Sequence, residues 1–241
     1  MCDNCIPDIP VFKKTTVHNL IVLDSSGSMS SIRKETLAGL NEVLAKCRQA
    51  QLRYQDDQVH FVTLVTFCGC TVRKVLDHIP AIDVPQLGLA DFVPCCTTPL
   101  HDAVYTSVKE LQTFIGDDDD SLAVVTVITD GYENDSRKHT RDDVLELVTR
   151  LTGLGWVFTY MGGGHDAEPV AKGLGIAFNR SYARTGEGVR EVLSRDSNMR
   201  MSLFERLKLY KDGCMASGAE PTRQERVKCY TQMSKDAFDE S

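Results

Sequence analysis

The sequence predicts an α/β domain in which helices cover both faces of a doubly wound, mostly parallel sheet that has one antiparallel edge strand, with further helices at the C-terminal end. Two observations support this prediction. Runs rich in β-branched residues alternate along the chain with segments whose apolar residues recur at helical spacing. In addition, the runs 17–24 and 122–130 are apolar on both faces, as is typical of central parallel strands buried between helices.

The size and charge of the chain fit one large domain with a C-terminal appendage. Its 241 residues are 42% hydrophobic, which is enough for a sizeable core. The formal net charge of −7 argues against nucleic acid as a partner, because nucleic-acid-binding surfaces are basic. The chain shows no signal peptide, no run of the ~18 apolar residues that span a membrane, and an odd number of cysteines. We therefore expect a soluble, cytoplasmic protein with reduced thiols.

The first segment, residues 1–16, is polar and interrupted by Pro7 and Pro10, so we expect an extended arm. This arm contains Cys2 and Cys5 in a C-x-x-C spacing. A zinc half-site is one interpretation, but its other ligands would have to come from a distant part of the chain, so an ordinary pair of thiols is favoured.

The α/β domain is expected over 17–195, and a helical extension packed on it over 196–241. After the first strand, the pattern predicts a helix over 30–50 that Ser30 or Ser31 caps. Two strand-like runs, 59–67 and 71–79, are separated by only three residues that include a glycine, which predicts a hairpin and hence the antiparallel edge strand. The further predicted elements are a connection over 80–98, helices at 99–115, 141–154, 188–193, 201–210 and 223–233, a short helix after Gly164, and strands at 122–130, 156–161 and 175–178.

Oxygen-bearing side chains lie at the carboxyl ends of the two strands predicted to be central. Asp24 ends the first strand, and Ser26 and Ser28 follow it, whereas Asp130 ends the second of these strands. Ligands of doubly wound sheets bind outside the carboxyl ends of the strands, so both carboxylates share one crevice if these strands are neighbours. Thr98 adds a hydroxyl from a third loop. Such hard oxygen donors suit Mg²⁺ or Ca²⁺ rather than Zn²⁺.

Together these loops resemble the metal-ion-dependent adhesion site of von Willebrand factor A domains. The motif D-x-S-x-S is present as Asp24, Ser26 and Ser28, the loop TTPLHDAV carries Thr98, and the loop VITDG carries Asp130. The resemblance covers 17–195. It implies a Mg²⁺ ion, with Mn²⁺ or Ca²⁺ as alternatives, held by the three hydroxyls with the two carboxylates in or near its shell. It also implies a metal-dependent protein-binding module, not an enzyme, whose partner completes the coordination with an Asp or Glu carboxylate.

The chain departs from the resembled pattern just before the threonine. Cys96 and Thr97 stand where many of these domains have two glycines, and Cys95 precedes them. The loop is therefore bulkier and carries thiols close to the expected metal. Reversible oxidation of Cys95 and Cys96 is a hypothesis that requires an exposed thiol of lowered pKa.

The main alternative is an enzyme, a Mg²⁺-dependent aspartyl-phosphate hydrolase of the haloacid dehalogenase type, with Asp24 as nucleophile and Asp130 as a metal ligand. Such phosphatases usually carry a second acid two residues after the nucleophile, where this chain has Ser26. The related transporting ATPases carry a lysine next to the nucleophile, where this chain has Ser25. The alternative also leaves Thr98 unexplained, so it is disfavoured.

Three other site classes are disfavoured on motif grounds. The glycines at 162–164 are not part of a G-x-G-x-x-G or a P-loop motif, which argues against nucleotide binding. Ser26 and Ser28 lack the G-x-S-x-G elbow of many serine hydrolases. A scaffold whose metal site has decayed is disfavoured because all five ligand positions are intact.

Overall fold

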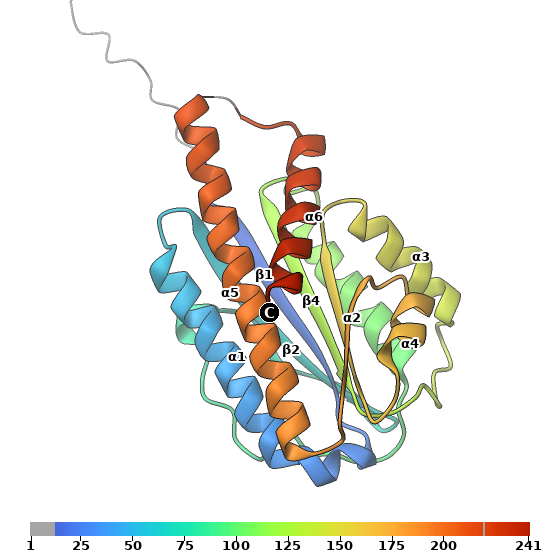
Figure 1. The fold of residues 1–241 in the computed structure, drawn as a ribbon. Helices are drawn as coiled ribbons and strands as arrows, with labels where there is room; N and C mark the ends of the chain where they lie inside the picture. Colours follow the sequence, from blue (N-terminus) through green and yellow to red (C-terminus); the bar gives the residue numbers. More distant parts are fainter. Residues whose placement is uncertain (1–12, 219) are drawn as a thin grey trace, which may run out of the picture.

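The computed structural model describes residues 13–218 and 220–241, which form a six-stranded sheet between two layers of helices (Figure 1). The strand order is β3-β2-β1-β4-β5-β6. Strand β3 is antiparallel to β2, and the other neighbouring pairs are parallel. The fold class predicted from the sequence, including the antiparallel edge strand, is confirmed.

The bounds of the elements agree closely with the sequence patterns in most of the chain. The strands are β1 (Thr15–Asp24), β2 (Gln58–Cys68), β3 (Thr71–Pro80), β4 (Ser121–Thr129), β5 (Val157–Gly163) and β6 (Phe178–Tyr182). The helices are α1 (Arg33–Arg53), α2 (Leu100–Ile115), α3 (Arg141–Thr152), α4 (Ala167–Gly173), α5 (Gly186–Ser217) and α6 (Arg223–Asp239), with short 3-10 helices at Gly27–Ile32 and Ala81–Asp83. Among these helices, none has the length and apolar character needed to cross a membrane.

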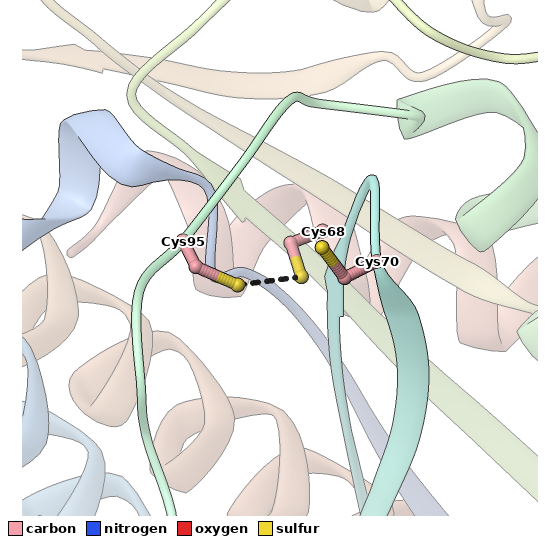
Figure 2. Close-up of side chains that lie close together, drawn as sticks. All are labelled: Cys68, Cys70 and Cys95. Atoms are coloured by element: carbon pink, nitrogen blue, oxygen red, sulfur yellow. Dashed lines mark hydrogen bonds between the residues drawn. The ribbon is translucent and has the colours of Figure 1, made fainter.

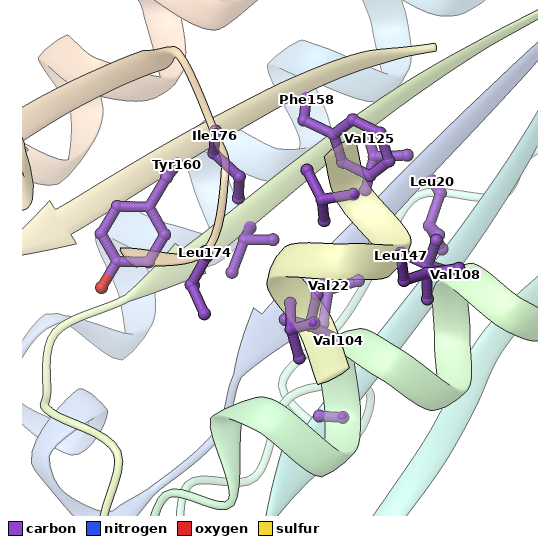
Figure 3. Close-up of a cluster of buried hydrophobic side chains, with 14 of the residues drawn as sticks. Leu20, Val22, Val104, Val108, Val125, Leu147, Phe158, Tyr160, Leu174 and Ile176 are labelled. Atoms are coloured by element: carbon purple, nitrogen blue, oxygen red, sulfur yellow. The ribbon is translucent and has the colours of Figure 1, made fainter. Parts of the chain in front are cut away.

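Alternating residues of the central strands supply the two halves of the core. Leu20 and Val22 of β1 point to the face covered by α2, α3 and α4, where the cluster in Figure 3 lies. Ile21 and Leu23 point to the opposite face, where they join buried residues of α1 and α5. Because both faces are covered, β1 and β4 are buried at nearly every position and contain the continuous apolar runs 20–23 and 122–125, which is the pattern that identified them.

Two predicted boundaries are wrong. Helix α1 is preceded by a 3-10 turn, so its N-cap is Ile32, and neither Ser30 nor Ser31 caps it. The last strand begins at Phe178, where the sequence predicted a strand over 175–178. Gly175 has a φ of 76° and lies in the turn that ends α4, a conformation that excludes it from a strand.

Helix α5 is continuous where the sequence predicted separate helices at 188–193 and 201–210. The residues between them, Asp196, Ser197 and Arg200, are polar but almost completely buried against the sheet. Their polarity interrupts the apolar period, although the helix itself does not break. Leu203 and Phe204 of this helix are fully buried in a cluster with residues of β1 and β4.

The predicted division at residue 195 therefore falls inside α5 and stays a prediction. Thr15 and Thr16, assigned to the N-terminal arm, belong to β1. Residues 1–12, with Cys2 and Cys5, lie outside the described residues.

Gly39 allows α1 to pack closely on α5, and we expect Gly39→Ala to destabilise the fold. A Cβ at Gly39 would lie 2.5 Å from Cδ1 and 3.0 Å from Cβ of Leu193. Overpacking of this kind costs about 1–3 kcal/mol and outweighs the better helix propensity of alanine. Gly213, in α5, has no atom within 4 Å of an added Cβ, so Gly213→Ala should be neutral or stabilising. Urea unfolding of both variants checks this, and equal midpoints would contradict it.

His60 makes the stability of the fold sensitive to acid. Its ring is fully buried, packs edge-on against Phe204, and lies 3.0 Å from Oε1 of Gln58. Burial, aided by the positive charge of Arg200, lowers the pKa of His60 from 6.5 to about 3. Below about pH 6.5 His60 binds a proton in the unfolded chain but not in the folded chain. Its contribution therefore lowers the free energy of unfolding by about 1.4 kcal/mol for each unit by which the pH falls.

Replacing His60 with Gln should remove this contribution. We expect the dependence of unfolding free energy on pH, measured by urea unfolding between about pH 6 and pH 4.5, to become shallower by about 1.4 kcal/mol per unit. Above about pH 7 the free energies of the two proteins should have the same pH dependence, since His60 is neutral in both states there. An unchanged slope in acid would show that His60 is not buried as the neutral form.

Candidate metal centre

The candidate site lies at the carboxyl ends of β1 and β4, which are parallel neighbours. Leu23 pairs with Ile128, so Asp24 and Asp130 leave the sheet at the same edge. The hydroxyl oxygens of Ser26 and Ser28 lie 3.0 Å apart, and the Ser28 hydroxyl donates a hydrogen bond to Oδ1 of Asp130. The first two loops of the predicted site therefore meet.

Thr98 completes the set from the third loop. A Cβ added to Gly131 would lie 3.5 Å from Oγ1 of Thr98 and 3.9 Å from Oγ of Ser28, so Gly131 is adjacent to both hydroxyls. Thr98 is buried, as are Asp24, Ser26 and Asp130. The structure thus brings together all five side chains that the sequence singled out.

Asp24 is held rigidly beneath the loop. Its Oδ1 accepts a hydrogen bond of 2.6 Å from the backbone N–H of Ser26, and its Oδ2 accepts one of 2.6 Å from the hydroxyl of Thr129. Burial raises the pKa of Asp24 above its ordinary value, although these hydrogen bonds oppose the shift. A nearby cation would favour the ionised form of this carboxyl group.

Asp130 is shared between the serine loop and a basic residue that the sequence analysis missed. Its Oδ2 lies 3.1 Å from Nε of Arg184, an ion pair that lacks the alignment of a hydrogen bond. The Arg184 guanidinium also donates to the backbone carbonyl of Asp130. Arg184 follows β6 in a segment without a recognisable motif, so only the tertiary structure relates it to the site.

The threonine loop is fastened to the segment after β4 by reciprocal hydrogen bonds. The backbone N–H of Thr98 donates to Oδ1 of Asn134 at 2.8 Å, and the N–H of Asn134 donates to the carbonyl of Thr98 at 3.1 Å. Glu133 accepts from the N–H of His101 at the start of α2 and from two N–H groups of its own loop. Burial raises the pKa of Glu133, but these hydrogen bonds and that of the Ser136 hydroxyl outweigh it and lower the pKa. Asn134 and Glu133 thus position the site.

The donors fit a hard divalent cation. Three hydroxyls and two carboxylates converge, and buried Oδ2 of Asp130 accepts no hydrogen bond. This all-oxygen set matches Mg²⁺, Mn²⁺ or Ca²⁺. Ser26, Ser28 and Thr98 would supply hydroxyl oxygens to the ion, and Asp24 and Asp130 would supply negative charge.

The sequence predicted that Cys95 and Cys96 lie near the site. In the structure the Cys95 thiol pairs with Cys68, which was not expected. The Cys95 thiol contacts the Cys68 thiol at 3.3 Å. Burial raises the pKa of Cys68, but hydrogen bonds from the Cys70 backbone and the Cys95 thiol outweigh it and lower the pKa. Hydrogen bonding to Cys68 raises the pKa of Cys95 to about 12. Cys68, which the sequence analysis did not assign to the site, is therefore the thiol most readily ionised of the pair.

Searches with the sequence found no matching protein-family model and no matching curated protein. Comparison with solved structures did find similar folds. The pilus adhesin SpaC from Lactobacillus rhamnosus GG matches with a TM-score of 0.58 and 13% identity over 80% of this chain and 31% of the adhesin. The VWA domain of SpRpn10 matches with a TM-score of 0.51 and 8% identity over 74% of this chain and 94% of that domain.

Proximal thread matrix protein 1 from the mussel byssus matches with a TM-score of 0.51 and 13% identity, over 81% of this chain and 46% of its own. This chain thus spans about half the length of the byssus protein and about a third of the adhesin. Identities this low establish the fold alone. With its sheet order, its helical layers and these structural neighbours, the chain has the fold of von Willebrand factor A domains.

Proposed function

We propose that this protein is a metal-dependent protein-binding module. The observation that carries the proposal is the convergence of five oxygen donors from three loops at the carboxyl ends of β1 and β4. Doubly wound sheets bind their ligands at this place. The likeness to a VWA domain and to a pilus adhesin is consistent with a module that binds other proteins.

The hydroxyls of Ser26, Ser28 and Thr98 are proposed to bind Mg²⁺ directly. Asp24 and Asp130 act in or near the coordination shell, and Thr129 and Arg184 hold these carboxylates in place. When bound, the ion would offer a coordination position to an Asp or Glu carboxylate of the partner, since Mg²⁺ retains exchangeable positions in sites of this kind.

Asp24 is better placed to support the loop than to attack a substrate. Both of its oxygens accept hydrogen bonds of 2.6 Å, and its side chain is fully buried. A nucleophilic carboxylate needs an unshared oxygen that reaches the reacting atom. This arrangement favours the binding module over the phosphohydrolase, and we expect no turnover of a generic phosphate ester.

Selection from a displayed random-peptide library tests the proposed function. The immobilised protein is incubated with the library in Mg²⁺, and bound peptides are eluted with a chelator. We expect the enriched peptides to share an Asp or Glu, and replacement of this residue with Asn or Gln to abolish binding. Peptides that bind equally well in chelator, or to the Thr98→Ala variant, would contradict the proposal.

A further inference from the structure

A second group of side chains with metal-binding chemistry lies beside the five oxygen donors of the candidate metal centre, which are called the oxygen site below. Cys68 ends β2, Cys70 lies in the turn before β3, and Cys95 lies in the loop before α2. Their three sulfur atoms lie within 4.8 Å of one another, and none of these cysteines is in a disulfide bond. Figure 2 shows the thiols of Cys68 and Cys95 facing each other, with Cys70 beside them.

Backbone hydrogen bonds hold the two cysteine-bearing segments together. The N–H of Gly69 donates to the carbonyl of Thr97 at 2.9 Å, and the N–H of Cys95 donates to the carbonyl of Ser25 at 2.8 Å. A Cβ on Gly69 would come within 1.9 Å of Oγ1 of Thr97, so only a glycine between Cys68 and Cys70 permits this approach. The thiols are therefore held in place by a defined frame.

The spacing of the sulfurs suits a tetrahedral soft metal ion. Zinc–sulfur bonds of about 2.3 Å place the sulfurs of a tetrahedral site about 3.8 Å apart. The sulfurs of Cys68 and Cys95 are 3.3 Å apart, and no pair in the group exceeds 4.8 Å, so small side-chain rotations reach this geometry. Three thiolates attract Zn²⁺ much more strongly than Mg²⁺, which prefers oxygen.

Cys96 follows Cys95 directly and is the thiol available as a fourth ligand. Its side chain is exposed and lies outside the group of three sulfurs that are within 4.8 Å of one another, so it would have to turn toward them. Its backbone has a φ of 60°, in the left-handed region that disfavours residues other than glycine. A cysteine thus occupies a position where glycine would be less strained, which is consistent with a use for its thiol.

We propose that Cys68, Cys70 and Cys95 form a zinc site, with Cys96 as the fourth ligand, that fastens the β2–β3 hairpin to the threonine loop. The site is separate from the oxygen site, and binding of Zn²⁺ releases the thiol protons to solvent. By linking the hairpin to the loop that carries Thr98, bound zinc would stabilise the frame of the oxygen site. The proposed zinc site does not use the C-x-x-C pair of the N-terminal arm, and it does not require oxidation of Cys95 with Cys96.

Cobalt substitution of the full-length, reduced and metal-free chain tests the proposal. Titration with Co²⁺ should give sulfur-to-metal charge-transfer absorption and the intense visible bands of tetrahedral cobalt, and these bands should saturate at one thiolate-bound ion per chain. One equivalent of Zn²⁺ should displace it. Cys70 is exposed, so Cys70→Ser should not disturb folding. This substitution should weaken Co²⁺ binding roughly a hundredfold.

Matched variants locate the site. Cys214→Ser, in α5, and the double variant Cys2→Ser with Cys5→Ser should bind Co²⁺ like the original chain. Thr98→Ala should retain Co²⁺ but lose the response to Mg²⁺, and Cys70→Ser should do the opposite, which separates this proposal from the proposed function. Absence of charge-transfer bands in the reduced protein, or binding that survives Cys70→Ser and disappears with Cys2 and Cys5, would overturn it.

Discussion

Thr98→Ala is expected to abolish the stabilisation of this protein by Mg²⁺. At a Mg²⁺ concentration a hundred times its dissociation constant, a site present only in the folded state contributes about 2.7 kcal/mol. For a chain of this size, that gain raises the melting temperature by roughly 5–10 °C. The variant lacks one of the three hydroxyls but keeps both hydrogen bonds that the backbone of residue 98 makes with the side chain and the N–H of Asn134. Thermal unfolding with and without Mg²⁺ measures the difference.

Thr97→Ala is the matched control for this experiment. Thr97 is adjacent in sequence but exposed, and its hydroxyl donates to Oδ2 of Asp135 rather than to the site. It should respond to Mg²⁺ like the original chain. Asp24→Ala should also lose the response, but it additionally leaves the Ser26 N–H unpaired, at a cost of about 1–3 kcal/mol, and removes one of the hydrogen bonds of the Thr129 hydroxyl, which keeps its contacts with Gly131. A full Mg²⁺ shift in Thr98→Ala would rule out the metal site as described.

Arg200→Met is expected to cost the largest amount of folding stability of any substitution considered. The Arg200 guanidinium is fully buried and donates hydrogen bonds of 2.7 Å to Oδ2 of Asp196, Oδ1 of Asn19 and Oγ1 of Thr126. Removing it leaves the buried Asp196 carboxylate without its partner, a loss of about 3–5 kcal/mol. This corresponds to a fall of roughly 6–20 °C in melting temperature.

The same helix supplies a control with the same spacing. Arg195 and Glu191 form an i, i+4 pair of 2.7 Å in α5, but their side chains are 47% and 61% exposed. Arg195→Met should change the unfolding free energy by at most about 0.5 kcal/mol, because water screens the pair. Combining Arg200→Met with Asp196→Leu should recover much of the loss, since no charge then remains unpaired. Equal losses in the Arg200 and Arg195 variants would contradict the assigned role of burial.

The sequence pattern predicted the sheet, because a strand that is buried on both faces needs a continuous run of apolar residues. Val22 and Leu23 face opposite helical layers, so neither position tolerates a polar residue. Where the buried residues are polar, the sequence pattern predicts the wrong structure. Asp196 and Arg200 look like a helix break, yet they pair with each other and lie inside α5.

The candidate metal ligands were predictable for a related reason. Asp24 ends a strand whose apolar pattern is clear, Asp130 directly follows another, and Ser26 and Ser28 lie in the loop after the first, so their place at the sheet edge follows from the strands. Thr98 could be added only through its resemblance to a known motif. Arg184 and Asn134, which hold Asp130 and Thr98 in place, have no local signal, because their roles depend on contacts with distant segments.

By itself, the sequence determined the layered α/β architecture, since strand periodicity encodes it. It also predicted the candidate ligands of the oxygen site, from their places at the strand ends and, for Thr98, from the resemblance to a known motif. Only the tertiary structure decided which strands are neighbours, how Asp130 is shared between Ser28 and Arg184, and that the Cys68 thiol faces the Cys95 thiol. Cys68 and Cys95 are separated by 27 residues. Such pairs form because the hairpin and the threonine loop pack together, and packing between distant segments leaves no periodic trace in either segment.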